Sequence, residues 1–278
     1  VDDNFIGNKE KLRKEILPSI FEWMKAHNHP FNLNTEASIN LADDEELMRL
    51  MTRAGFDTVF VGIESPNEES LVECRKVPNN NRDLVGSVKK LQKFGLEVQG
   101  GFIVGFDQDP STIFERLIQF IQETNIVTAM VGLLNAPPGT RLHKRLLGEG
   151  RILNAFSGNN TDFSMNFLPR MDLQSLMEGY QKVLNQIYSP KDYYKRVKGF
   201  LKDFKPIEGR PFRFQSHYLK ALVKSVFILG IVGKERVYYW RLFFWSLFNR
   251  PRMFPLAITF SIYGFHFRRV FEQYMSGL

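Results

Sequence analysis

The segment 56–63 has the sequence FDTVFVGI, in which apolar side chains follow one another almost without interruption. A short run rich in β-branched and aromatic residues, starting directly after Gly55, predicts a buried strand. The segment 96–104, LEVQGGFIV, has the same character, and a helical pattern over 82–94 lies between the two and is stopped by Gly95. Strand, helix and strand in this order predict a βαβ unit with parallel strands.

The same alternation continues outward in both directions. Further strands are predicted at 31–39 and 127–134, and further helices at 9–26, from 43, at 111–123 and at 140–147. Parallel strands with right-handed crossovers form either an open doubly wound sheet or a barrel, and the pattern leaves both open. In either case ligands bind at the C-terminal ends of the strands.

Three parts are predicted along the chain: 1–150 for the α/β unit, 151–211 for a loop and helices that close it, and 212–278 for a helical tail. The segment 148–171 is rich in glycine and asparagine and is expected to be a loop. Amphipathic helices are predicted at 173–187 and 192–204, and the prolines of 206–211 predict a hinge before the tail.

Charged residues are distributed unevenly along the chain. The whole sequence carries a net charge of +7, but residues 195–278 hold 16 Lys/Arg against 4 Asp/Glu and 20 of the 38 aromatic side chains. Two interpretations of this basic aromatic tail stay open: a helical subdomain that packs its aromatics inward, and a peripheral contact with an anionic membrane surface. Nucleic-acid binding is the less favoured third alternative. No apolar run is long enough for a transmembrane span.

Several common chemistries have no support in the sequence. The single cysteine, Cys74, excludes an internal disulfide and an all-cysteine metal or iron–sulfur site built from this chain alone, and fits a reducing, cytoplasmic location. We expect Cys74 to be a packing residue. The five histidines lack zinc-site spacing, and no phosphate-binding glycine loop follows a strand.

Polar groups and glycines gather instead at the predicted strand ends. They are Asp2, Asp3 and Asn4; Glu36 with its neighbours; Glu64 and Ser65; and the glycine-rich run 100–107. Carboxylates there could bind an ammonium, a ribose diol or a metal, and glycines would let a flat ring approach the backbone. Each group alone also has an ordinary structural explanation as a helix cap or as relief of crowding. Together they favour a ligand site.

At these strand ends the sequence resembles the radical S-adenosylmethionine (SAM) proteins that carry a cobalamin-binding domain. The motifs are Asp2–Phe5, Gly62–Ser65, Gly101–Gly105 and Pro138–Thr140. The run TEASINLA at 35–42, the segment SGNNTD at 157–162 and the basic tail are similar to the branch that includes hopanoid C-2 methylase. The resemblance covers essentially the whole chain and implies a TIM-like partial barrel of six strands, followed by a helical C-terminal domain.

The resemblance also implies roles for particular residues. Asp2, Asp3 and Asn4 would hold the SAM amino group, while Glu64 and Ser65 would lie near its ribose or methionine part. Gly101, Ile103 and Gly105 would lie against the adenine, and Glu36 would face the same cavity. The implied cofactors are SAM, a 4Fe-4S cluster and cobalamin, and no catalytic residue is nominated.

The sequence departs from the family pattern at the cysteine motif that binds the cluster. The Cys-x-x-x-Cys-x-x-Cys motif is absent, and Val1 matches the end of the second strand of the family. We therefore expect a fragment whose cluster ligands and cobalamin domain lie upstream, and which is inactive alone. The favoured function is that of a methyltransferase acting on an unactivated carbon of a lipid-like substrate. A radical cyclase or rearrangement enzyme, and a non-catalytic membrane-associated binding protein, are the alternatives.

Overall fold

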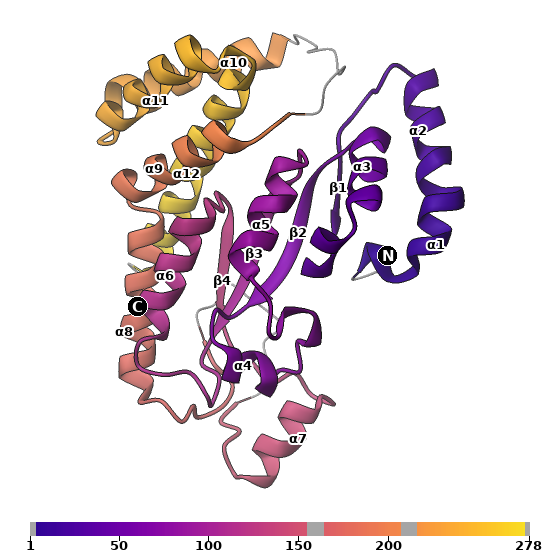
Figure 1. Ribbon diagram of the computed structural model, residues 1–278. Coiled ribbons are helices and arrows are strands. Elements are labelled where there is room, and N and C mark those ends of the chain that lie inside the picture. Colours follow the sequence, from indigo (N-terminus) through magenta and orange to yellow (C-terminus); the bar gives the residue numbers. More distant parts are fainter. Residues whose placement is uncertain (1–3, 155–163, 207–215, 276–278) are drawn as a thin grey trace.

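The computed structural model describes residues 4–154, 164–206 and 216–275 and shows an α/β body followed by a group of packed helices (Figure 1). The body is built on a parallel sheet whose strands follow in the order β1-β2-β3-β4. They are β1 (Leu33–Glu36), β2 (Phe56–Glu64), β3 (Glu97–Val104) and β4 (Ala129–Leu133). The predicted α/β class and parallel pairing are confirmed. Strand β1 is shorter than the predicted 31–39, and a 3₁₀ turn begins at Ile39.

Helices connect these strands where the apolar spacing predicts them. The elements of the body are η1 (Phe5–Asn8), α1 (Lys9–Lys11), η2 (Leu12–Ile16), α2 (Leu17–Ala26), η3 (Ile39–Asp43), α3 (Glu45–Ala54), α4 (Glu68–Glu73), η4 (Val77–Asn79), α5 (Leu84–Lys93), α6 (Ile113–Thr124) and α7 (Arg141–Gly148). Local chemistry fixes several ends. Asp44 and Asp83 cap α3 and α5 by accepting backbone hydrogen bonds, and Gly55 ends α3 with a φ of 119°.

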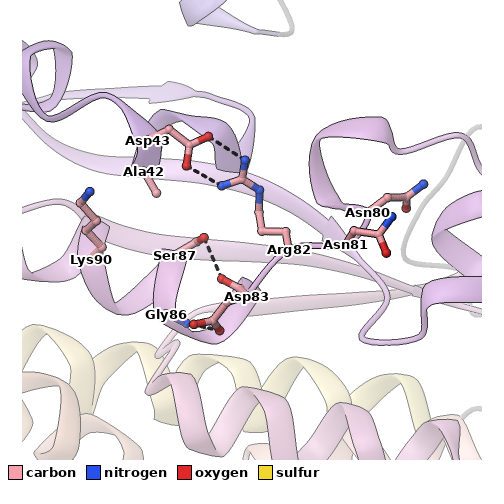
Figure 2. Close-up of a pocket in the computed structure, with 9 residues that line it drawn as sticks. All are labelled: Ala42, Asp43, Asn80, Asn81, Arg82, Asp83, Gly86, Ser87 and Lys90. Carbon is pink, nitrogen blue, oxygen red and sulfur yellow. Dashed lines mark hydrogen bonds and ion pairs between the residues drawn. The ribbon is translucent and has the colours of Figure 1, made fainter.

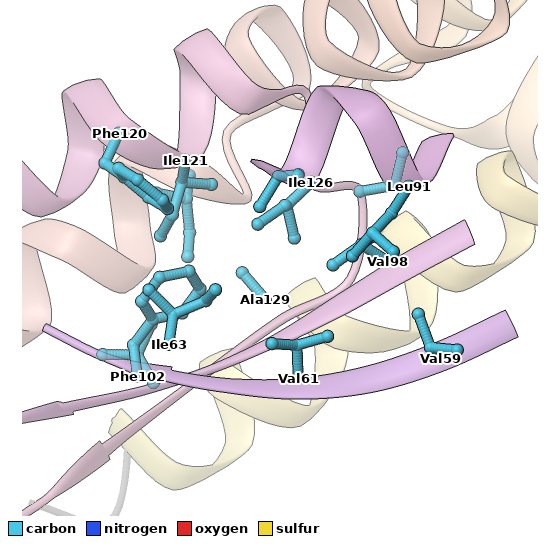
Figure 3. Close-up of a cluster of buried hydrophobic side chains, with 14 of the residues drawn as sticks. Val59, Val61, Ile63, Leu91, Val98, Phe102, Phe120, Ile121, Ile126 and Ala129 are labelled. Carbon is cyan, nitrogen blue, oxygen red and sulfur yellow. The ribbon is translucent and has the colours of Figure 1, made fainter. Parts of the chain in front are cut away.

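The consecutive strand order determines where the crossover helices lie. Right-handed crossovers that always advance in one direction place α3, α5 and α6 on the same face of the sheet. Figure 3 shows the core on that face, with Leu91 of α5 and Phe120 of α6 turned toward Val61 and Phe102 of the strands. The described strands show no reversal of strand order, which a doubly wound sheet requires.

The opposite face of the sheet is partly open to solvent. Side chains alternate along β2 and β3, so that Val59 and Val61 are buried under the helices while Phe60, Gly101 and Ile103 keep partial exposure on the other face. Met130, which pairs in register with Gly101, is 59% exposed there. This open face leads to the C-terminal strand ends.

The outer edge of β4 is closed by tyrosines rather than by another strand. Helix α8 (Leu173–Ile187) packs on α6, and its Tyr180 hydroxyl donates to the Val131 carbonyl at 3.0 Å. The Tyr188 hydroxyl donates to the Ala129 carbonyl at 2.8 Å and accepts from the Ala129 amide at 3.3 Å. These bonds satisfy buried backbone groups that an edge strand would otherwise leave unpaired.

The remaining elements form the helical part of the chain. They are α9 (Pro190–Asp203), α10 (Ser216–Ser225), the π-helical η5 (Val226–Val232), α11 (Arg236–Asn249), η6 (Pro251–Met253) and α12 (Phe254–Met275). The Tyr193 hydroxyl of α9 donates to the Phe260 carbonyl at 2.7 Å, and Gly264 of α12 lies against the Tyr193 ring. Among the described helices, none combines the length and apolar character that crossing a bilayer requires.

The predicted loop, hinge, domain boundaries and Cys74 packing can now be compared with the structure. Within the predicted loop 148–171, residues 155–163 lie outside the described residues, as does most of the predicted hinge 206–211. The three domain boundaries stay predictions. The expectation that Cys74 packs inside is wrong, because the residue is exposed at the end of α4, where its thiol donates to the Leu71 carbonyl. Desolvation raises the pKa of this thiol, which makes it a poor nucleophile.

Candidate functional site

A cavity of about 370 Å³ lies at the C-terminal ends of β1 and β2. Its lining residues are Asn4, Glu36, Ala37, Ser38, Phe60, Gly62, Glu64, Lys76 and Pro78. Asn4, Glu36 and Glu64, which come from three separate predicted strand ends, are therefore brought together around one hollow. Asp2 and Asp3 lie outside the described residues. The volume falls in the range of about 300–1,000 Å³ that is usual for small-molecule sites.

Asn4 attaches the N-terminal segment to the end of β1. Its side-chain oxygen accepts from the Ser38 amide at 3.1 Å and from the Ser38 hydroxyl at 3.4 Å. The Ser38 hydroxyl also donates to the Asn40 side chain at 2.7 Å. This network fixes Asn4 beside the cavity.

Glu64 ends β2 in an unusual backbone conformation and forms an ion pair inside the cavity. Its φ is +65°, and the register between β2 and β3 shifts at this point. Lys76 Nζ donates to Glu64 Oε1 at 2.7 Å, and both side chains are largely shielded from solvent. A Cβ on Gly62 would lie 2.5 Å from Glu64 Oε1 and 2.9 Å from Lys76 Nζ. The ion pair therefore lies directly over Gly62, and a larger residue there would displace its side chains.

Lys76 is the charged site residue that sequence reasoning missed. It follows Arg75, whose φ is +58°, in the turn after the short helix α4. That turn returns the chain over the end of β2, which brings residue 76 within hydrogen-bond distance of residue 64. A lone lysine in a polar loop carries no periodic signal, and only the path of the turn could have indicated it.

Glu36 supplies a second carboxylate with a different environment. It pairs in register with Phe60 on the open face of the sheet, and its side chain is exposed. The cavity thus offers two carboxylates, one carboxamide and one ammonium group around the aromatic ring of Phe60. Such a set can bind a ligand that carries both charges together with an apolar or flat part.

Ser65 is not brought to this cavity. It is fully buried, and its hydroxyl accepts from the Asn67 amide at 3.2 Å. Asn67 in turn donates to the Ser70 hydroxyl at 2.9 Å and to the Gln108 carbonyl at 3.2 Å. The hydroxyl of Ser65 belongs to a buried network that connects the loops after β2 and β3.

The residues at the glycine-rich end of β3 have two different structural roles. Gly101 and Ile103 lie on the open face, and a Cβ on Gly101 would be 2.8 Å from the Phe60 ring. Gly105, with a φ of +103°, is a turn residue whose amide donates to Asp109 Oδ2 at 2.8 Å. None of the three lines the 370 Å³ cavity, although Gly101 borders it through Phe60.

Two arginines pair with the shielded carboxylate of Asp107 and brace the neighbouring strand end. Asp107 accepts from Arg151 at 2.7 Å and from Arg145 at 2.6 Å. Burial alone would raise the pKa of Asp107, but the hydrogen bonds from these two guanidinium groups outweigh it and lower the pKa to about 2. The network joins the loop after β3 to α7 and to the segment that follows it.

A second, larger hollow of about 520 Å³ lies between η3 and the start of α5 (Figure 2). Its principal charges already pair with each other, since Arg82 donates to both oxygens of Asp43 at 2.8 and 2.6 Å. Asp83 accepts from the Gly86 amide at 2.8 Å as the cap of α5. We therefore regard the strand-end cavity, with its exposed Glu36, as the candidate ligand site.

Comparisons with known proteins identify relatives of this chain. Residues 140–278 match the family model described as "Domain of unknown function (DUF4070)". An uncharacterized methyltransferase of Synechocystis is 38% identical over 96% of the chain. The chain belongs to the DUF4070 family, among radical SAM proteins of the cobalamin type. The predicted resemblance to the hopanoid C-2 methylase branch is confirmed.

Two further relatives of this DUF4070 chain have names that state a reaction. Hopanoid C-2 methylase of Rhodopseudomonas palustris is 35% identical over 70% of the chain, and bacteriochlorophyllide d C-12(1)-methyltransferase of Chlorobaculum tepidum is 25% identical over 70%. The chain spans 50% of the Synechocystis protein and 36% and 42% of these two. The relatives are methyltransferases of the radical SAM family.

Proposed function

We propose that this chain is the SAM-binding part of a cobalamin-dependent radical SAM methyltransferase that acts on an unactivated carbon of a lipid-like substrate. The observation that carries the proposal is the cavity at the ends of β1 and β2, where Glu36, Glu64 and Lys76 gather. The one-directional parallel sheet supports a partial barrel, because a barrel is wound in this way. The names of the relatives support the methyltransferase class.

The cavity fits the charges that SAM carries. SAM has an α-ammonium, a carboxylate, a ribose diol and a flat adenine ring. Glu36, exposed at the end of β1, is suited to accept from the ammonium, and Lys76 is suited to donate to the carboxylate. Glu64 can accept from the ribose hydroxyls. Asp2 and Asp3 remain predicted partners of the amino group.

The open face of the sheet suits an apolar substrate beside that cavity. Phe60 and Ile103 are partly exposed on it, and Met130 is more than half exposed. Small residues, Gly101 and Gly132, separate these apolar side chains on the strands. An apolar floor next to a polar cavity is the arrangement that a lipid-like molecule and SAM would need.

The cluster does not fit the residues of this chain. Over the described ranges, no group of three or more His, Cys, Asp or Glu side chains could hold a metal ion, and the sequence contains one cysteine. The proposal therefore assigns the cluster ligands and the cobalamin site to residues outside this chain. Radical and methyl-transfer chemistry comes from the cofactors. Residues 36, 64 and 76 bind and orient SAM, and the apolar floor keeps water away from the substrate carbon.

The test is SAM binding to this chain by isothermal titration calorimetry. Glu36→Gln and Glu64→Gln each remove a charged acceptor and should weaken binding by about 1–3 kcal/mol. Glu69→Gln, on the exposed side of α4, is the matched control and should bind as the unchanged chain does. Undetectable binding to the unchanged chain, or equal affinities for all four proteins with folding intact, would remove the support for this site.

A further inference from the structure

Exposed apolar side chains gather on one side of the helix formed by α10 and η5. Leu219, Val223, Phe227 and Ile231 recur at intervals of four residues, and each is at least half exposed. The buried side of the same helix is formed by Ser225, Leu229 and Gly230. A regular apolar stripe on the side that faces away from the protein is not required by the packing of the described residues.

Helix α11 lies beside η5 and carries exposed aromatic side chains of its own. The chain turns back at 233–235, and the Trp240 side chain of α11 donates to the Gly230 carbonyl at 2.9 Å, which holds α11 beside η5. Phe244 stacks on Trp240, and Phe248 lies parallel to Phe244 one turn further. Phe248 is 76% exposed. The opposite side of α11, with Tyr239 and Leu242, is buried.

Exposed cations lie on the same helices as these apolar side chains. Lys220, Lys224 and Arg241 are exposed on the same helices. The sequence 216–252 contains one acid, Glu235, which is buried and accepts from Arg268 of α12 at 2.5 Å. The outward surface of α10, η5 and α11 is therefore apolar and cationic, and its described residues expose no carboxylate.

We propose that this surface binds the interface of an anionic bilayer. The bilayer face consists of Leu219, Val223, Phe227, Ile231, Phe244 and Phe248, flanked by Lys220, Lys224 and Arg241. Apolar and aromatic side chains enter the boundary of the acyl chains while the cations contact lipid phosphates. None of the described helices could span the membrane, so the contact is peripheral. A second copy of the chain is a poorer occupant, because a symmetric interface would bring these cations together.

The experiment is co-sedimentation of the full chain with vesicles of phosphatidylcholine, with and without phosphatidylserine, at low and high salt. The chain should bind the phosphatidylserine vesicles at low salt and leave them at high salt. Lys220→Gln with Lys224→Gln should lower the partition coefficient by about 30-fold, since each cation near such a surface contributes about 1 kcal/mol. Phe227→Ser with Phe248→Ser should reduce binding at least as strongly.

Matched controls use exposed residues of the α/β body, outside the bilayer face. They are Lys25→Gln with Lys93→Gln for charge, and Phe31→Ser, which is 50% exposed, for apolar area. Both controls should bind as the unchanged chain does. The proposal is overturned if the unchanged chain stays in the supernatant under every condition, or if face and control variants bind equally. It is also overturned if light scattering without vesicles shows a dimer that the phenylalanine variants dissociate. SAM binding plays no part in this assay, so its outcome is independent of the proposed function.

Discussion

The buried carboxyl group of Glu97, at the N-terminal end of β3, offers a test of the electrostatics inside the protein. It is the first residue of β3 and only 9% exposed, and its Oε1 has no hydrogen-bond partner among the described residues. Burial is the main cause that raises the pKa of Glu97 to about 7, and repulsion from Asp57 adds to it. A hydrogen bond from Gln99 acts in the opposite direction. Burial and then the charge of Glu97 also raise the pKa of Tyr263 on α12, which faces this end of the sheet.

The magnitude follows from the size of this pKa rise. The change from 4.5 to about 7 corresponds to about 3 kcal/mol, at about 1.4 kcal/mol for each pKa unit. Between these two pH values the native protein keeps a proton on Glu97 that the unfolded chain releases. The contribution of Glu97 to the free energy of unfolding therefore falls as pH rises from 4.5 to about 7, and is constant above that.

The perturbation is Glu97→Gln, which keeps the shape and removes the ionisation. Urea unfolding at about pH 5 and about pH 8 gives the stability of both proteins. The free energy of unfolding of the variant, minus that of the unchanged chain, should rise by about 2–3 kcal/mol between about pH 5 and about pH 8. Glu22→Gln, an exposed residue of α2, controls for the general loss of one negative charge. A stability difference between Glu97→Gln and the unchanged chain that is the same at both pH values would refute the reasoning.

Two further changes test contacts that hold the strand ends and the sheet edge. Arg151→Ala should lower the free energy of unfolding at neutral pH by about 1–3 kcal/mol, because it removes a charged partner of buried Asp107. The stability that this pair contributes is lost as pH falls from 3.8 toward 2. Urea unfolding should therefore show a larger loss of stability over this pH range in the unchanged chain than in the variant. Equal losses in both proteins would show that the pair is unimportant. Tyr188→Phe should cost about 1–3 kcal/mol by leaving both backbone groups of Ala129 without a partner. Hydrogen exchange should then accelerate at the Ala129 amide, and unchanged protection there would contradict the role of the hydroxyl.

The strand-end site could be predicted in part from the sequence. Polar residues that follow parallel strands must meet at one edge, and Asn4, Glu36 and Glu64 do line one cavity. Ser65 occupies a neighbouring sequence position but is fully buried. Adjacent residues at a strand end point in different directions, and the sequence contains no signal for which of them faces the ligand.

The sequence by itself determined the local features of this protein. Apolar spacing predicted the strands and helices of the α/β body, and Asp44, Asp83 and Gly55 fix helix ends, because these effects act within one or two turns of chain. The tertiary structure decided what depends on distant partners. Lys76 reaches Glu64 only through the turn after α4, and Tyr188 seals β4 from 59 residues away. The same packing buries one side of α10, η5 and α11 and leaves the apolar side exposed, since the sequence of an amphipathic helix does not state which neighbour it meets.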